Sequence, residues 1–130
     1  MALTPRGAKQ KGANYERELA RFFNTEMADE FGVEAQRALL SGGGRSIGGT
    51  DVDGVPELHV EAKRVEALSF REAIRQAETA VSKKRVKDVP VVITRKNHEE
   101  THDSIVMIRL REFMPMYRAW LRGRRQAPAG

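Results

Sequence analysis

Residues 50–64 of the chain read Thr-Asp-Val-Asp-Gly-Val-Pro-Glu-Leu-His-Val-Glu-Ala-Lys-Arg, and this stretch predicts a β-hairpin. Apolar and polar residues alternate over residues 58–63, and successive side chains of a strand point to opposite faces of a sheet. A strand here directs Glu61 and Lys63 to one face and the apolar residues to the core. The short segment 51–53 is separated from this strand by a Gly-Val-Pro turn, so the two pieces can pair.

The paired strands would bring three charged side chains, Asp51, Glu61 and Lys63, to one patch. Two carboxylates bind a hard divalent cation through oxygen, while a lysine positions a water or stabilises the charge that builds on a phosphate. The pattern therefore favours metal-assisted cleavage of a phosphodiester. The same residues are also typical of an ion-pair ladder on a solvated sheet face, which is the alternative interpretation.

The composition indicates one globular domain with a polyanionic partner. The chain has 130 residues, of which 40% are hydrophobic and 32% are charged, and its net charge is +5. A basic balance favours nucleic acid as the partner. The sequence contains no cysteine, no signal-peptide pattern and no apolar run of the roughly 20 residues that cross a bilayer. We therefore expect a cytoplasmic protein without a membrane partner.

The predicted elements alternate between helices and strands. Helices are predicted over residues 13–31, from the capping box at 69–72 to the basic cluster at 83–87, and over 110–121; strands are predicted over 33–40, 51–53, 58–63, 89–94 and 104–110. This order predicts an α/β fold in which helices flank a small mixed β-sheet. We expect residues 1–12 to form a basic flexible arm, residues 13–122 a single domain, and residues 123–130 a flexible tail.

The second and third predicted helices, like the first, carry apolar stripes that we expect to be buried. Their stripes consist of Phe70, Ala73, Ile74, Ala77 and Val81 in the second helix, and of Phe113, Met116, Tyr117, Trp120 and Leu121 in the third. In the first helix, Glu16 lies at the margin of the apolar face. From spacing alone it is more typical of a solvated acid in the first turn, where the helix dipole favours a negative charge.

Residues 98–102, His-Glu-Glu-Thr-His, match the zinc-protease signature His-Glu-x-x-His. That chemistry needs both histidines one turn apart on a helix. The five residues stand between two predicted strands without an apolar helical face, so we interpret the match as a polar loop. His59 shares the predicted face of Glu61, and a lone histidine beside a strand carboxylate is more often structural than catalytic.

Three stretches together resemble a known nuclease family. They are Lys-Gly-Ala-Asn-Tyr-Glu-Arg-Glu-Leu at residues 11–19, the glycine-rich loop 41–49 running into Asp51-Val52, and His-Val-Glu-Ala-Lys at residues 59–63. The chain resembles the PD-(D/E)XK nuclease superfamily, and more closely the archaeal-type (Hjc-like) Holliday junction resolvases and their phage relatives. The resemblance covers roughly residues 9 to 110, and its first stretch is the most specific because the superfamily's core motif is loose.

The resemblance implies a restriction-endonuclease-like αβββαβ core and a set of site residues. Carried over by position, the metal ligands would be Glu16, Asp51 and Glu61, with Lys63 completing the catalytic set. Asp53 competes with Asp51 as the motif aspartate, and we prefer Asp51 because Asp51-Val52-x-Gly54 matches the relatives better. Gln76 falls where many members carry a supporting helix glutamine. The motif proline is absent, since Thr50 stands before the aspartate.

The family further implies a homodimer that cuts a four-way DNA junction symmetrically with Mg²⁺, for which Mn²⁺ can substitute. A phage or prophage relative would act in the cytoplasm of its host cell. Two alternatives remain open: a related nuclease that nicks or restricts other DNA, and a catalytically silent nucleic-acid-binding module. Contacts to the DNA backbone are expected from basic residues, namely Lys9, Lys11, Arg17, Arg45, Arg64, Lys83, Lys84, Arg85 and Lys96.

Overall fold

The computed structural model describes residues 5–38, 50–64 and 68–126, which form three α-helices and one five-stranded sheet. The helices and strands follow the predicted order: α1 (Pro5–Phe31), β1 (Gln36–Arg37), β2 (Val52–Asp53), β3 (Leu58–Lys63), α2 (Phe70–Lys84), β4 (Val89–Thr94), the 3-10 turn η1 (Thr101–Asp103), β5 (Ile105–Met107) and α3 (Leu110–Gln126). The predicted α/β fold with a small mixed sheet is therefore confirmed, and its first six elements have the order αβββαβ.

The sheet is mixed because one connection crosses over a helix. Its strands lie in chain order, β1 to β5, with antiparallel pairs everywhere except between β3 and β4. The predicted hairpin is present, with Val52 opposite Val60. Helix α2 connects the parallel strands β3 and β4, as a parallel pair requires a crossover connection. The carboxyl ends of β3 and β4 consequently meet at the same edge of the sheet.

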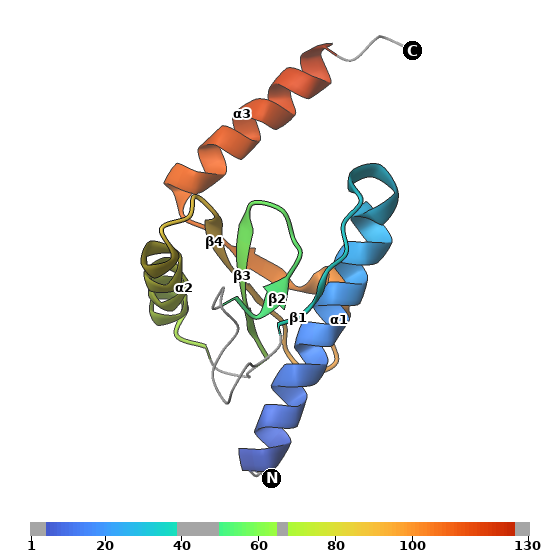
Figure 1. Ribbon diagram of the computed structural model, residues 1–130, viewed down its shortest axis with the longest axis vertical. Coiled ribbons are helices and arrows are strands. Elements are labelled where there is room, and N and C mark those ends of the chain that lie inside the picture. The colour runs from blue at the N-terminus through green and yellow to red at the C-terminus, as the bar shows by residue number, and fades with distance from the viewer. Residues whose placement is uncertain (1–4, 39–49, 65–67, 127–130) are drawn as a thin grey trace.

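Helices α1 and α2 cover opposite faces of this sheet (Figure 1). The larger core lies under α1 and the smaller one under α2. The α1 side buries Tyr15 and Leu19 against alternate residues of the central strands, including Val60, Val91 and Ile93, and the α2 side buries Ala73 and Ile74 against Val92. Covering both faces explains why β4 reads as a continuous apolar run rather than as an alternating one.

Gly54 lies where the β2–β3 connection passes close to the segment between α1 and β1. Its φ is +88°, a left-handed conformation that glycine adopts without strain. A Cβ atom at this position would overlap the backbone carbonyl of Glu34. Gly32 ends α1 with φ +65°, but there a Cβ atom would meet nothing within 4 Å. Both the backbone conformation and close packing therefore favour glycine at position 54, whereas only the backbone conformation favours it at position 32.

Helix α1 begins earlier than the sequence predicted. It starts at Pro5, so residues 5–12 are helical and do not form the separate basic arm that we expected. The prediction gave too much weight to Gly7 and Gly12, each of which costs a helix only about 1 kcal/mol relative to alanine. Proline is favourable in the first turn, where its missing N–H has no helical partner. Residues 1–4 lie outside the described part of the chain.

Helix α2 starts where the capping box predicted, with Ser69 at the N-cap, but no side-chain hydrogen bond caps it. Three of its stripe residues are buried, whereas Phe70 is 55% exposed, so the prediction of a buried Phe70 was wrong. Phe70 is the first helical residue and lines an open cavity together with Thr94 and Ile105. Periodicity identified the correct face of the helix but could not show that its first residue borders a cavity rather than the packed core.

Helix α3 differs most from the prediction. It projects away from the sheet (Figure 1), and none of its residues is buried. Its predicted core stripe is instead solvent-facing, with Phe113, Tyr117 and Trp120 stacked on one another at centroid distances of 5.8 and 6.1 Å. The helix also runs to Gln126, so residues 123–126 belong to it and not to a tail; residues 127–130 lie outside the described part. Amphipathic spacing predicts an apolar face but not what covers it.

No helix in the described part of the chain combines the length and the apolar character that crossing a bilayer requires.

Candidate functional site

The hairpin and strand β3 bring Asp51, Glu61 and Lys63 together at the edge of the sheet. The Asp51 carboxylate accepts a hydrogen bond from the backbone N–H of Ala62 at 2.9 Å, which places it beside the residue between Glu61 and Lys63. Lys63 Nζ lies 3.5 Å from Glu61 Oε1. The Thr50 hydroxyl bonds the backbone of Val60 on the opposite strand and fixes the register at this point.

The pKa of Asp51 reflects its burial and the nearby carboxylates. Burial, and then the negative charge of Glu61, raise the pKa of Asp51 from 3.8 to about 6. The Ala62 N–H and the Lys63 charge act in the opposite direction, and Glu16 adds to the increase. A carboxyl beside another carboxylate in a partly desolvated place holds its proton more tightly, and a bound cation relieves that repulsion.

Glu16 reaches the same region from α1 and is held by an arginine. Its Oε2 accepts a hydrogen bond from Arg37 Nε at 2.8 Å, and both side chains are partly buried. Glu16 follows Tyr15, which is buried in the core and bonded through its hydroxyl to Ser104 at 2.8 Å. The packing of Tyr15 thus fixes the part of α1 that carries Glu16, and the spacing-based interpretation of a solvated acid does not describe it.

Glu61 is only 4% exposed and His59 is fully buried, because α2 covers this face of β3. The interpretation of a solvated ion-pair ladder is therefore wrong. Leu58, Val60 and Ala62 face the α1 core as predicted. The opposite face carries a buried carboxylate rather than an exposed one, and a buried carboxylate is stable only with compensating partners or a cation.

Asp53 and Gln76 have no described contact with Glu61 or Lys63. Asp53 pairs with Gln36 of β1 in the register of the sheet, whereas the charge of Asp51 interacts with that of Glu61. The choice of Asp51 over Asp53 stays a prediction. Gln76 is exposed on α2, off its buried face, as its spacing indicated.

The predicted DNA contacts are distributed over several elements. Lys83 and Lys96 are exposed; Arg85 ends α2 in a left-handed conformation with φ +55°; Arg17 bonds Asn14, and Arg64 bonds Asn97. Lys84 differs from the rest, since its Nζ lies 3.0 Å from His59 Nδ1 in a partly buried contact. Lys11 is partly buried in α1, while Arg45 and the side chain of Lys9 lie outside the described residues.

The His-Glu-x-x-His stretch does not form a helix. His98 has φ +68°, and only residues 101–103 make a single 3-10 turn. Glu100, His102 and Asp103 are exposed. Among the described residues, their potential ligand atoms all lie within 4.8 Å of one another, close enough to hold one metal ion. Glu16, Asp51 and Glu61 form a looser set by this measure.

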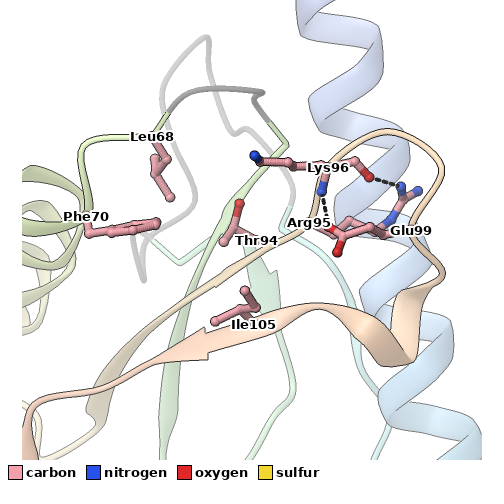
Figure 2. A pocket seen from close by; sticks show the side chains of 7 residues that line it. All are labelled: Leu68, Phe70, Thr94, Arg95, Lys96, Glu99 and Ile105. Carbon is pink, nitrogen blue, oxygen red and sulfur yellow. Dashed lines mark hydrogen bonds between the residues drawn. The ribbon is translucent and has the colours of Figure 1, made fainter.

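A cavity of about 390 Å³ opens beside Thr94, the last residue of β4 (Figure 2). In the register of the sheet, Thr94 lies between Lys63 of β3 and Ile105 of β5, and its hydroxyl bonds the Lys63 carbonyl at 2.7 Å. Figure 2 shows Leu68 and Phe70 on one side of the cavity, with the exposed Lys96 side chain reaching across it. The cavity therefore has apolar walls and the Lys96 ammonium at its rim, and it lies along β4, the strand next to the one that carries Glu61.

Sequence reasoning missed the partners that hold the site together. Arg37 lies 21 positions from Glu16, and Lys84 lies 25 positions from His59. Arg95 similarly forms two hydrogen bonds of 2.7 Å with Glu18 and fixes α1 to the end of β4. Each pair joins separate elements, and no local spacing rule connects them. The sequence contained one indication of such a contact, because strand alternation places His59 and Glu61 on the same face.

Comparison with family models, with curated proteins and with solved structures finds no match to this chain.

Proposed function

We propose that the chain is a Mg²⁺-dependent, structure-selective DNA endonuclease that resolves four-way junctions by paired phosphodiester cleavage. One observation carries the proposal: the Asp51 carboxylate is bonded to the Ala62 N–H, between a buried Glu61 and Lys63. This is the juxtaposition that the resemblance to junction resolvases requires. The basic composition, with a net charge of +5, supports a DNA substrate.

The residues fit a hard divalent cation. Their donors are carboxylate oxygens, which Mg²⁺ and Mn²⁺ prefer, and the pKa of Asp51 is raised first by burial and then by the nearby Glu61 charge, which a bound cation would offset. Asp51 and Glu61 would hold the cation, and Glu16 would join them from α1. When bound, the cation would polarise the scissile phosphate and lower the pKa of a water.

The side chains of the chain itself would divide the remaining work. Lys63, whose Nζ lies 3.5 Å from Glu61, would orient the attacking water or stabilise charge on the phosphate. Arg37 orients the Glu16 carboxylate before any cation binds. The cavity beside Thr94, with its Phe70 wall and the Lys96 ammonium, would accept the nucleoside next to the scissile phosphate.

A homodimer would place two such sites on opposed strands of one junction, because a two-fold axis matches the symmetry of a four-way junction. Backbone contacts from basic residues such as Lys83 and Arg85 would recognise the shape of the branched DNA rather than its sequence.

The test is cleavage of an end-labelled four-way junction beside a linear duplex of the same sequence, with Mg²⁺ and with EDTA. We expect paired symmetric nicks on the junction alone, and only with Mg²⁺. Asp51→Asn and Glu61→Gln should each lower the cleavage rate by at least about 10³-fold and leave junction binding within about threefold, because they remove cation ligands and not DNA contacts.

Asp53→Asn is the matched control, since it changes an aspartate two positions away in the same way and should retain cleavage. Equal cutting of duplex and junction would replace the junction specificity by a nicking or restriction-like activity. Junction binding without any product in the presence of Mg²⁺ or Mn²⁺ would instead identify a silent binding module and reject the proposal.

A further inference from the structure

His59 is fully buried between a lysine and the central glutamate of the candidate site. Its Nδ1 lies 3.0 Å from Lys84 Nζ in the last turn of α2, and its Nε2 lies 3.8 Å from Glu61 Oε2. Nε2 is buried and finds no hydrogen-bond partner among the residues that the structure describes. A chain of three side chains therefore runs from the surface end of α2 to the carboxylate.

The lysine determines which nitrogen of His59 carries the proton. A lysine ammonium has three donors and no acceptor, so Nδ1 of His59 must accept the hydrogen bond from Lys84. In the neutral ring, the proton then lies on Nε2. This N–H points to Glu61 and not to solvent, because the ring has no exposed surface. The geometry thus specifies one tautomer and one direction of donation.

The Glu61 carboxylate is flanked by two nitrogens without being tightly bound by either. Its Oε1 lies 3.5 Å from Lys63 Nζ and its Oε2 lies 3.8 Å from His59 Nε2. Both distances exceed those of ordinary N–H···O bonds, which are about 2.7–3.2 Å. A hydrogen bond of ordinary length from Nε2 to Oε2 would give this buried donor a partner, and a buried donor without one is unfavourable.

We propose that Lys84 and His59 are positioning residues that orient the Glu61 carboxylate for a divalent cation. The Nε2–H of His59 anchors Oε2, and Oε1 is thereby presented toward Lys63 and Asp51. Partners that orient a metal ligand typically change metal affinity by about 10- to 100-fold when they are removed. This role rests on the proposed function for its purpose, while the tautomer and the cation affinity can be measured without DNA.

The first measurement is the tautomer of His59 in the metal-free protein, by long-range nitrogen–proton correlation NMR. We expect the Nε2–H form alone, with Nδ1 as an acceptor. A ring protonated on Nδ1, or on both nitrogens, would overturn the proposal, because His59 could not then accept from Lys84. This readout needs no variant and no substrate.

The second measurement compares amide substitutions by calorimetric titration with Mn²⁺ in the absence of DNA. Glutamine places its amide nitrogen near the position of Nε2, whereas asparagine places it near Nδ1. His59→Gln should therefore keep the dissociation constant within about threefold, and His59→Asn should raise it about tenfold or more. Lys84→Met keeps a side chain of similar length in this partly buried place, and it should raise the Mn²⁺ dissociation constant by a smaller factor than His59→Asn. It provides the test if His59→Asn does not fold.

The outcomes separate the two proposals. If the unaltered chain binds Mn²⁺ and all three variants bind it equally well, the positioning role fails and the cation site stands. Equal weakening in His59→Gln and His59→Asn would reduce His59 to a structural residue. If the unaltered chain binds no cation, both the proposed nuclease site and the positioning role are rejected.

Discussion

The Asp51 carboxyl titrates in a range where most carboxyls are already ionised. Burial and the Glu61 charge raise its pKa to about 6 in the folded chain, against 3.8 for an ordinary aspartate. Between these two values the folded chain holds a proton that the unfolded chain has released. The free energy of unfolding therefore falls as the pH rises through this window and levels off above pH 6 or so.

We expect this fall to contribute about 2–3 kcal/mol between pH 4 and pH 7 in EDTA, measured by urea unfolding. Asp51→Asn should remove that contribution from the pH profile, because the amide does not titrate. Asp53→Asn should leave the profile unchanged. A profile that is identical in Asp51→Asn and the unaltered chain would contradict the assignment of the raised pKa to this carboxyl.

At the residue scale, the sequence predicted that Asp51, Glu61 and Lys63 lie close together, but not which partners hold them. Asp51, Glu61 and Lys63 lie within 13 positions, and a hairpin joins them by simple pairing. The Arg37 and Lys84 contacts depend on how α1 and α2 pack against the sheet. That packing is set by the whole core, so no local pattern contains it.

At the element scale, the β2–β3 connection can be tested at Gly54. Gly54→Ala should lower the free energy of unfolding by about 3 kcal/mol or more, because its Cβ atom would overlap the Glu34 carbonyl and its φ is +88°. Chemical denaturation measures this loss. Gly32→Ala is the matched control, since φ is +65° there but the space is open, and it should cost only about 1–2 kcal/mol. Equal losses in the two variants would show that close packing at Gly54 does not matter.

Helix α3 should contribute little to the stability of the domain. None of its residues is buried, so a chain ending after Arg111 retains both cores and the Arg109 and Arg111 bonds to Glu78. We expect its Tm to fall by less than about 5 °C in circular dichroism. Ile74→Ala, which removes buried volume beneath α2, should cost about 2–5 kcal/mol and lower Tm further. A truncated chain that loses its cooperative transition would contradict this prediction.

Local sequence patterns predicted a helix or strand best where the residues indicated both its hydrophobic periodicity and its first and last positions. The β4 strand has the predicted bounds because an apolar β-branched run reports burial on two faces. Helix α1 extended beyond its predicted start, and the stripe of α3 met no partner sheet. Amphipathic spacing is a property of one element, whereas burial is a property of two.

At the scale of the whole molecule, a net charge of +5 should make nucleic-acid binding sensitive to salt. The logarithm of the affinity for a four-way junction should fall linearly with the logarithm of salt concentration, by about 0.9 for each phosphate contacted. Lys96→Gln should reduce that slope by about one contact, because Lys96 lines the cavity beside Thr94 (Figure 2). Fluorescence anisotropy over a salt series measures the slope.

Arg125→Gln serves as the control at the far end of α3, where we expect no change in slope. A slope that is unchanged in Lys96→Gln but reduced in Arg125→Gln would move the DNA path from the cavity to α3. A salt-independent affinity would contradict phosphate recognition altogether.

Strand β3 gives one of its faces to the α1 core and the other to the candidate site. Its side chains alternate between the two faces, so each position contacts either the packed core or the candidate site. We expect such a segment to change slowly over evolutionary time, because few of its positions lack a packed neighbour. The residues of α3 are not buried, so divergence among descendants of this sequence should accumulate there first.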